Sequence, residues 1–484
     1  MKILQVSCSY FPNKIGGTEG YVHNLSQELT KRGHKVFINY IDVFCEENGP
    51  EIKTKEYAFE GLPVFVIEKN VFSLKTAELY FNYSESSQVS FTDYLKKIQP
   101  DIVHFHHLSP TDVTMQMQAA KKMRLPIIFT YHTPMMTCAH TDMLYLGKKV
   151  CDGKLEYKKC LACAQTKYNI PFLLAWLWAG IPESMAKSLG AAISKSNFKG
   201  RLATWLQMPW LTRERMNRWR MLFNLIDRFV VLSQWSSEVL VKNGIAPEKI
   251  TLCRQGIIKP CATNGTACGR PSDAGGEAGR SIPDAGLNKE VTSIMRKPKD
   301  NTHKLRLGYL GRIHPVKGLD VLLKAFKLLP LHLPIELYIY GDGGQDDAVY
   351  YRRLLWQSHR DKRINWMGLL SEEEKFTALV KLDALVIPSR WLETGPLVLL
   401  EAWAAGLPVI GARSGGILEL VAQDCGGLLF RPQDARDLAG LILRVIKYPD
   451  ALEKLKEAIP RLRTIDEVTT EMEELYQGVR LRDL

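Results

Sequence analysis

A regular alternation of short apolar segments with longer amphipathic ones limits this chain to few folds. Apolar runs of strand length occur at 2–7, 35–40, 102–106, 127–131, 229–232, 306–310, 335–340 and 384–387. Segments with the 3.6-residue period of helices lie between them, for example at 18–32, 318–329 and 434–447. Strands that alternate with helices form parallel sheets covered on both faces. The pattern therefore predicts an α/β protein with two doubly wound domains that face each other across a cleft.

Breaks in the alternation divide the chain. The first domain is expected over 1–258, with an insertion at about 138–225. Residues 259–303 contain few large apolar side chains and repeat Asp-Ala-Gly at 273–275 and 284–286, which predicts a glycine-rich linker. The second domain is expected over 304–450, and residues 451–484 are expected to be helical.

Size and composition exclude several classes of protein. The chain of 484 residues is 46 % apolar and 24 % charged, which excludes wholesale disorder and allows more than one core. It has no uncharged apolar run of eighteen residues, so no membrane-spanning helix is expected, and its first residues lack the regions of a signal peptide. These features predict a cytoplasmic protein. The net charge of +12 favours anionic partners.

Polar clusters follow several strands of the second half. The run from Gly311 to Gly318 brings Arg312 and Lys317 to a helix start, which suits a di-anionic phosphate, although a solvated basic loop is equally compatible. The segment around Met367 could edge a base or simply turn the chain. Glu401 lies in an apolar helix, where it needs hydrogen bonds from sugar hydroxyls or from a neighbouring amide or arginine.

Three motifs occur together in one order. These are the early Gly16-Gly17-x-Glu19 loop, the Gly-Arg-x4-Lys-Gly run at 311–318 and the Glu-x7-Glu spacing of Glu393 and Glu401. Together they resemble the family-4 glycosyltransferases of the GT-B fold, over nearly all of two Rossmann-like domains. The resemblance implies retaining transfer of a sugar from a nucleotide-diphosphate donor, without an obligatory metal. It also implies that the helix at 451–484 crosses back to the first domain.

The resemblance assigns the phosphate-binding residues. Arg312 and Lys317, which follow Gly311, match the family's diphosphate-binding pair, and fixed cations there stabilise the charge that develops on the leaving phosphate. The main-chain amides at the start of the following helix add to that field; they belong to Gly395, Leu397 and Val398. Gly16 and Gly17 match the loop that approaches the diphosphate, where a side chain would clash.

The remaining assignments concern the sugar and the base. Glu401 matches the acid that holds the ribose hydroxyls, Glu393 the acid that orients the transferred sugar, and Met367 is expected near the base. His132 follows a strand where this family often has a histidine in the sugar site; the alternative is a packed or capping histidine. One of His104, His106 and His107 could line the cleft, but a neutral histidine trio at such a strand end is more often structural. No catalytic base is expected, because the leaving phosphate oxygen takes the acceptor proton.

Cys138, Cys151, Cys160 and Cys163 have the spacing C-x12-C-x8-C-x2-C, which is compatible with a tetrahedral zinc site, with free thiols or with disulfides. They are similar to a cysteine-bearing insertion in some bacterial members of the family. The resemblance does not imply what that insertion does.

A basic aromatic segment follows the cysteines. Residues 170–228 contain nine Lys or Arg and three acids, and the tryptophans at 205, 210 and 219 interleave with Arg201, Arg213, Arg215, Arg218 and Arg220. This mixture suits an anionic membrane interface; the alternative is a helical lid on the same domain. No nucleic-acid motif accompanies the charge.

The interpretation that follows is a peripheral enzyme on the inner face of the cell membrane. It would transfer sugar to a glycan or lipid-linked acceptor in polysaccharide synthesis. A nucleotide-sugar epimerase of the same fold is the alternative. Thr394, Pro396 and the segment 251–257 depart from the usual family pattern, which leaves the sugar pocket and any donor contact there open.

Overall fold

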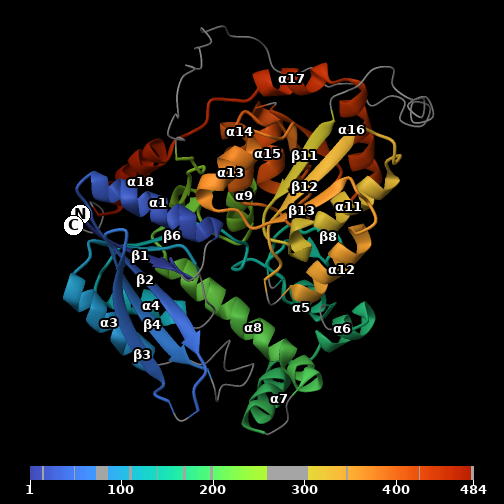
Figure 1. Ribbon diagram of the computed structural model, residues 1–484. Helices are drawn as coiled ribbons and strands as arrows, with labels where there is room; N and C mark the ends of the chain where they lie inside the picture. The colour runs from blue at the N-terminus through green and yellow to red at the C-terminus, as the bar shows by residue number, and fades with distance from the viewer. Residues whose placement is uncertain are drawn as a thin grey trace.

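The computed structural model describes residues 1–12, 16–47, 49–71, 85–107, 112–138, 140–166, 170–196, 200–258, 304–344, 347–424 and 426–480. The predicted linker 259–303 lies outside the described residues. Two parallel sheets, each covered by helices, face each other, and an inserted group of helices extends beyond them (Figure 1). The predicted α/β class with two doubly wound units is confirmed.

The first sheet has the strand order β10-β9-β6-β5-β1-β2-β4-β3, parallel except for β3, which pairs antiparallel with β4. Its strands are β1 (Lys2–Ser7), β2 (Lys35–Phe44), β3 (Ile52–Phe59), β4 (Leu62–Asn70), β5 (Ile102–Phe105), β6 (Ile127–Tyr131), β9 (Arg228–Val231) and β10 (Ile250–Leu252). Its helices are α1 (Gly17–Lys31), α3 (Glu85–Ile98), α4 (Asp112–Lys122) and α9 (Gln234–Lys242). Every residue of β5 and β6 is buried, because helices cover both faces of the sheet.

The second sheet is entirely parallel, with the order β13-β12-β11-β14-β15-β16. Its strands are β11 (Leu305–Leu310), β12 (Ile335–Tyr340), β13 (Ile364–Gly368), β14 (Ala384–Ile387), β15 (Val409–Ala412) and β16 (Gly427–Phe430). Its helices are α11 (Leu319–Leu328), α12 (Ala348–Ser358), α13 (Glu372–Leu379), α14 (Leu397–Ala404), α15 (Gly415–Asp424), α16 (Ala435–Lys447) and α17 (Asp450–Glu457). The strand order reverses between β11 and β14, and sheets of this kind bind ligands at the carboxyl ends of the strands beside such a reversal.

An insertion separates β6 from β9. It contains the hairpin β7 (Leu144–Tyr145) and β8 (Lys149–Val150), followed by α5 (Tyr157–Gln165), α6 (Phe172–Trp178), α7 (Glu183–Lys195) and α8 (Arg201–Leu225). Helix α8 has 25 residues and is therefore roughly 37 Å long. Its carboxyl end packs into the core of the first domain through Trp219, Leu222 and Phe223. Helices α6 and α7 lie at the far end of the insertion, beyond both sheets (Figure 1).

The chain crosses between the domains a second time near its end. Ile257 N donates to Arg463 O and Ile465 N donates to Ile257 O, both at 2.9 Å, so the two crossings are paired. Beyond this pairing, α18 (Ile465–Arg480) packs beside α1 (Figure 1). Tyr476 fixes its register, because the phenol OH contacts His104 Nδ1 at 2.8 Å inside the first domain. The last helix is therefore part of the core of the first domain.

Among the described residues, no helix combines the length and the apolarity needed to span a bilayer.

Candidate functional site

The candidate site lies at the carboxyl ends of β11 and β14, two neighbouring strands of the second sheet. The loop after β11 carries Arg312 and Lys317, and the loop after β14 carries Glu393. Arg390 N donates to Val316 O at 2.8 Å, so the two loops are joined along their backbones. Residues that the sequence places far apart are thus held side by side where an open α/β sheet binds its ligand.

Glycine at 318 is required for this arrangement. Gly318 has φ +71°, which is the left-handed region, and a Cβ there would lie 1.9 Å from the carbonyl oxygen of Pro388. Gly341 is similar, because its Cβ would lie 2.0 Å from the oxygen of Gly311. Gly318 of the predicted phosphate loop and Gly341 after β12 therefore allow the close approach of the strand-end loops to one another.

An ion pair between Lys317 and Glu393 forms the centre of the site. Lys317 Nζ donates to Glu393 Oε1 at 2.8 Å, and Ser389 Oγ donates to the same oxygen at 2.7 Å. The Lys317 ammonium also lies 5.0 Å from the centre of the Trp391 ring. Burial alone would raise the pKa of Glu393, but the charge of Lys317 and these hydrogen bonds outweigh it, so the pKa is lowered. Glu393 is therefore an anion at neutral pH.

Arg312 is exposed beside this pair. Its backbone is fixed, because Tyr309 OH donates to Arg312 O at 2.9 Å. Within the described part of the chain, no hydrogen-bond partner is placed at its guanidinium group. A cation with a fixed backbone and an unused fork of donors is suited to a phosphate.

The start of α14 completes the phosphate side of the site. Pro396 precedes the helix, so the amides of Leu397 and Val398 are among its unpaired first-turn donors. A Cβ added to Gly17 would lie 3.6 Å from Leu397 Cδ1, which places the glycine loop of the first domain against this helix. Further along α14, Glu401 lies 3.6 Å from Lys375 Nζ, with its side chain about one-third exposed.

His132 follows β6 in the first domain, and its backbone lies against the loop that carries Glu393. The ring is buried, and its Nε2 lies 3.1 Å from His106 Nδ1. Burial, with a smaller effect of His107, lowers the pKa of His132 to about 3, so the ring is neutral at pH 7. Thr394 Oγ1 donates to the backbone oxygen of His132 at 2.6 Å and ties it to the residue after Glu393. A neutral imidazole here can orient a sugar hydroxyl but cannot supply a positive charge.

His104 and His106 are buried in a hydrogen-bond network. His104 bonds to Thr130 Oγ1 at 2.7 Å in addition to Tyr476, and His106 Nε2 lies 2.6 Å from Gln5 Oε1. Burial, followed by the neighbouring histidines, lowers both pKa values well below the usual range. Their contacts are those of structural side chains.

These uncharged histidines predict a loss of stability in mild acid. As the pH falls below about 6.5, the unfolded chain binds protons that the folded chain does not, so each histidine lowers the free energy of unfolding by about 1.4 kcal/mol per pH unit. For His132 the loss continues until the pH reaches its folded pKa of about 3. Urea unfolding at about pH 7.5 and about pH 5.5 measures the effect. An equal urea midpoint at the two values would contradict the neutral assignment.

The two domains also meet through contacts that the motifs did not reveal. Trp235 Nε1 donates to Glu393 O at 2.9 Å, and the backbone amides of Gln234 and Trp235, at the start of α9, both donate to the Glu419 carboxylate at 2.8 Å. Leu392 N donates to Asp142 O at 3.4 Å. The loop that carries Glu393 is therefore held from both sides of the cleft.

Some site residues were missed from the sequence, and one predicted residue stands apart. Ser389 and Trp391 contact Glu393 and Lys317, but a single serine or tryptophan after a strand carries no specific signal. Gln255 lies within the segment whose role was open, and its side chain is packed against Gly395. Met367 lies on the edge strand β13 and is exposed. Its place near a base stays a prediction.

The four cysteines lie around the β7–β8 hairpin and α5, and none of them forms a disulfide. Leu146 N donates to Cys163 Sγ at 3.2 Å, and burial raises the pKa of Cys163 to about 11. Burial also raises the pKa values of Cys151 and Cys160; Asp152 and then a neighbouring thiol add to the effect at Cys151, and neighbouring thiols add to it at Cys160. Across the described ranges, no three His, Cys, Asp or Glu side chains are placed so that they could hold a metal ion. The zinc site stays a prediction from the spacing of the cysteines.

The basic aromatic segment requires a correction, because α8 uses many of its side chains internally. Arg218 and Trp219 are buried, and Arg218 pairs with Glu214 at 3.3 Å. Arg215 donates to the backbone oxygens of residues 135 and 138, and Arg213 stacks over the ring of Tyr157. The predicted membrane face is therefore wrong for Arg218 and Trp219, which are buried, whereas Arg213 and Arg215 are half-buried and contact groups of the same domain.

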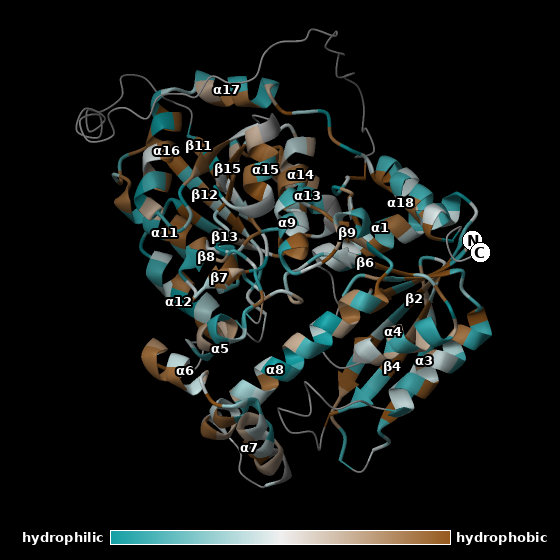
Figure 2. Cartoon of the chain, turned by 180° about the vertical axis from the view of Figure 1, so that it is seen from behind, coloured by the Kyte–Doolittle hydropathy of each residue, from teal (hydrophilic) through white to brown (hydrophobic). Residues whose placement is uncertain are grey.

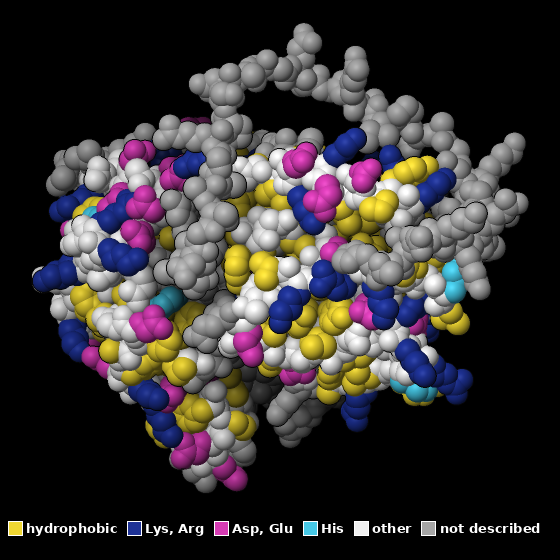
Figure 3. All heavy atoms as spheres, turned by 45° about the horizontal axis from the view of Figure 1, so that its top comes forward, with side chains coloured by type: hydrophobic (Ala, Val, Ile, Leu, Met, Phe, Trp, Pro, Cys, Tyr) yellow, Lys and Arg dark blue, Asp and Glu magenta, His cyan; other side chains and the backbone are white. Residues whose placement is uncertain are grey.

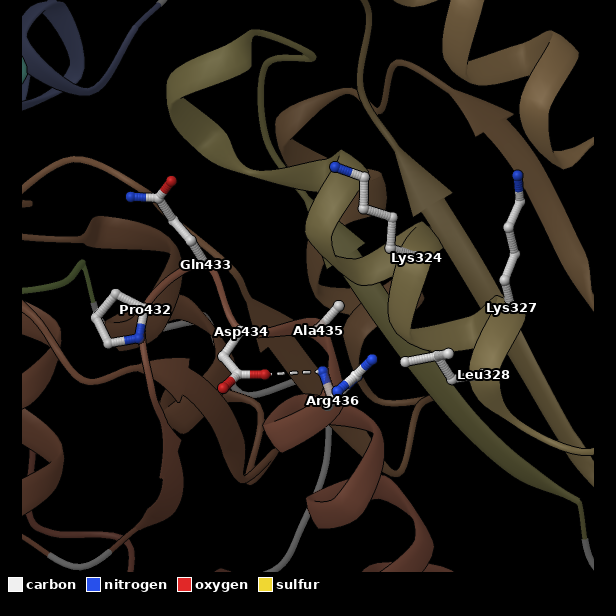
Figure 4. A pocket seen from close by; sticks show the side chains of 8 residues that line it. All are labelled: Lys324, Lys327, Leu328, Pro432, Gln433, Asp434, Ala435 and Arg436. Carbon is white, nitrogen blue, oxygen red and sulfur yellow. Dashed lines mark hydrogen bonds between the residues drawn. The ribbon is translucent and has the colours of Figure 1, made fainter. Parts of the chain in front are cut away.

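A separate surface hollow of about 570 Å³ lies between α11 and the start of α16 (Figure 4). It is lined by Lys324, Lys327, Leu328, Pro432, Gln433, Asp434, Ala435 and Arg436. The amides of residues 436 and 437 are already capped by the Asp434 carboxylate. None of the predicted site residues lines this hollow.

Comparison with known proteins agrees with this geometry. Residues 15–155 match the family model described as Glycosyltransferase Family 4, and residues 290–461 match the one described as Glycosyl transferases group 1. A glycogen synthase of Mycobacterium tuberculosis is 32 % identical over 173 residues, which are 35 % of this chain and 40 % of that enzyme. This chain thus spans less than half the length of that relative.

Two further proteins match along nearly the whole chain. An uncharacterised 42.6 kDa protein in the cps region of Klebsiella pneumoniae is 21 % identical over 99 % of this chain and 100 % of its own length. The structure of the Anabaena protein HepE in complex with UDP and glucose superposes with a TM-score of 0.58 at 14 % identity, covering 99 % of this chain and 100 % of that one. The second match shows that the folds are alike.

Proposed function

Because this chain belongs to the family-4 glycosyltransferases of the GT-B fold, we propose that it transfers a sugar from a nucleoside-diphosphate donor to a glycan or lipid-linked acceptor, with retention of configuration. The observation that carries the proposal is the Lys317–Glu393 ion pair beside the exposed Arg312, at the ends of two neighbouring strands. The complex of HepE with UDP and glucose supports a donor of this class.

The cations serve the leaving group. As the bond between the sugar and the β-phosphate breaks, negative charge grows on the phosphate, and in this proposal Arg312, Lys317 and the first amides of α14 stabilise that charge. Each charge-assisted hydrogen bond supplies about 1.5–3 kcal/mol. Because side-chain cations neutralise the diphosphate, the proposed reaction requires no metal ion.

The sugar lies between Glu393 and His132 in this proposal. Glu393 is an anion that accepts from hydroxyls, and neutral His132 orients a hydroxyl from the other domain. Glu401 accepts from the ribose hydroxyls, exchanging part of its interaction with Lys375 for them. In same-face attack the leaving phosphate oxygen takes the acceptor proton, so no side chain is assigned as the base.

The acceptor is proposed to be a glycan or a lipid-linked precursor in polysaccharide synthesis, reached at the inner face of the cell membrane by a peripheral enzyme. The relative named glycogen synthase supports a glycan acceptor. The exposed apolar end of the insertion, described below, supports the membrane location.

The proposal is tested by a donor panel. UDP-, GDP- and ADP-sugars are incubated with the protein, and release of the nucleoside diphosphate is followed with and without a membrane extract. We expect one donor to react and its release to depend on the extract. Conversion of the donor to another nucleotide sugar without extract would show an epimerase instead, and absence of any reaction with every donor would contradict the assignment.

A further inference from the structure

Helix α6, in the insertion, exposes most of its apolar side chains. The exposed members are Phe172, Leu173, Leu174, Trp176 and Leu177, each between 44 % and 67 % exposed. Figure 2 shows the helix as a hydrophobic segment at the edge of the molecule. Exposed apolar groups of this density mark an interaction surface on a protein.

The exposed side chains cover more of α6 than one partner face would need. At about 100° per residue, positions 172 to 177 place their exposed side chains over an arc of about 200°. A helix that packs on one neighbour carries an apolar stripe of about 100°. An arc twice as wide suits a helix embedded in an apolar medium that surrounds it, as at the boundary of headgroups and acyl chains.

The remaining side of α6 is anchored. Ala175 is buried, and the Trp178 ring stacks on Trp205 of α8 with 5.0 Å between ring centres. Trp205 Nε1 donates in turn to Gln165 Oε1 of α5 at 3.2 Å. The exposed side chains thus project from a fixed aromatic base.

Charge around α6 favours anionic lipid. Residues 157–182, between Glu156 and Glu183, contain three lysines and no Asp or Glu, and one of these lysines, Lys159, pairs with Asp152. Lys158 is exposed, and its Nζ lies 5.7 Å from the centre of the Trp176 ring. Tryptophan with a neighbouring lysine is typical of the depth of lipid headgroups, where the ring is half-buried and the ammonium meets phosphate.

Other surfaces differ from this end of the molecule. Near α6, Met185 of α7 and Leu202 at the start of α8 are also exposed. Figures 1 and 2 both show α6 and α7 beyond the two sheets. On the face shown in Figure 3, by contrast, acidic and basic side chains are interspersed among hydrophobic ones. The exposed apolar surface is therefore a local feature of the insertion, where Glu183 at the start of α7 is exposed as well.

We propose that α6, with Lys158, inserts into the headgroup layer of a bilayer that contains anionic lipid and so holds the enzyme on the membrane. This inference rests on the proposed transfer to an acceptor at a membrane. It also joins the membrane to the site, since α5 leads from α6 back to the hairpin, and Asp142, two residues before the hairpin, accepts through its backbone oxygen from Leu392 N beside Glu393.

The test is co-flotation with vesicles of equal parts phosphatidylcholine and phosphatidylglycerol. We expect a variant carrying Leu173→Ser, Trp176→Ser and Leu177→Ser to bind at least about tenfold more weakly than wild type. The matched control carries Leu331→Ser, Val349→Ser and Trp356→Ser, three residues of the second domain that are at least as exposed, and we expect it to bind as wild type does.

A second variant tests the charge. Lys158→Glu is expected to weaken binding to these vesicles several-fold, and added salt is expected to reduce the difference. Unaltered circular dichroism of each variant shows that it is folded. Equal binding by wild type and the α6 variant would overturn the proposal. A wild-type dimer that dissociates in the α6 variant, without vesicle binding by either, would overturn it in favour of a second copy as the partner.

Failure of this proposal is distinguishable from failure of the proposed function. Binding of UDP by calorimetry is expected to be equal in wild type and the α6 variant. The Arg312→Ala variant, in turn, is expected to float with vesicles as wild type does. Loss of vesicle binding in Arg312→Ala would contradict the assignment of the membrane contact to α6.

Discussion

A Lys317→Ala variant is expected to release nucleoside diphosphate at least about a hundredfold more slowly than wild type, the scale of losing one transition-state stabiliser. The alanine removes the cation opposite the leaving phosphate. It also leaves Glu393, only 9 % exposed at its side chain, without its ion partner. Breaking a buried pair from one side costs about 3–5 kcal/mol, so we also expect lower stability. Initial rates and urea unfolding at neutral pH measure the two effects.

A double variant separates the loss of rate from the loss of stability. With Glu393 also changed to alanine, no unpaired carboxylate remains, so we expect part of the stability to return while the rate stays low. Lys324→Ala is the matched control. Lys324 Nζ lies 3.2 Å from Asp320, but the Lys324 side chain is 61 % exposed, so we expect this variant to keep both its rate and its stability close to those of wild type. A rate for Lys317→Ala within threefold of wild type, roughly 0.65 kcal/mol, would remove Lys317 from the site.

The contribution of the Lys317–Glu393 ion pair to stability depends on pH. Because the pKa of Glu393 is lowered in the folded protein, its contribution to stability is present above the unfolded value of about 4.3 and is lost as the pH falls through the folded value. Without Lys317, burial dominates and raises the pKa of Glu393. The acid-dependent contribution of this residue should then change sign between wild type and Lys317→Ala.

An Arg312→Ala variant is expected to show a loss of rate of the same size, at least about a hundredfold, with little change in stability. The side chain is exposed and its guanidinium has no hydrogen-bond partner among the residues that the structure describes, so folding does not depend on it. Rates with the reactive donor and thermal unfolding of the same preparation measure both.

Arg312→Lys is the informative companion. It keeps the charge but loses the planar fork of donors, so an intermediate rate is expected if two phosphate oxygens are contacted. A fully active Arg312→Lys would show that charge alone is needed. A fully active Arg312→Ala would contradict the phosphate assignment, because the exposed residue has no other role in the site.

The fold could be predicted from the sequence because the strands and helices of a parallel α/β sheet appear as alternating apolar and amphipathic segments. Strand β12 occupies the predicted residues 335–340, and α11 begins and ends within one residue of the predicted 318–329. The order of the motifs likewise predicted that Lys317 and Glu393 belong to one site. What the sequence could not reveal is their direct ion pair, because it depends on the neighbouring positions of β11 and β14 in the sheet.

Long-range contacts explain the remaining differences. Thr394 was noted as unusual, but its hydrogen bond to the backbone of His132 joins residues 262 positions apart, and no local pattern encodes it. The charge of the basic aromatic segment was visible, whereas the carbonyls that receive Arg215 were not. For the same reason, α6 could not be distinguished from a core helix before its neighbours were known.

The paired crossings near Ile257 and Arg463 determine the order in which the chain can complete its domains. Helix α18 supplies Val468, Met472, Tyr476 and Val479 to the core of the first domain, yet the ribosome makes it after the whole second domain. During synthesis, the first domain therefore emerges with part of its apolar surface uncovered and with His104 lacking the phenol that it bonds in the folded protein. The second domain can fold as a contiguous unit in the meantime. Completion of the first is consequently a late, long-range step, in which transiently exposed surface is open to chaperones or to aggregation.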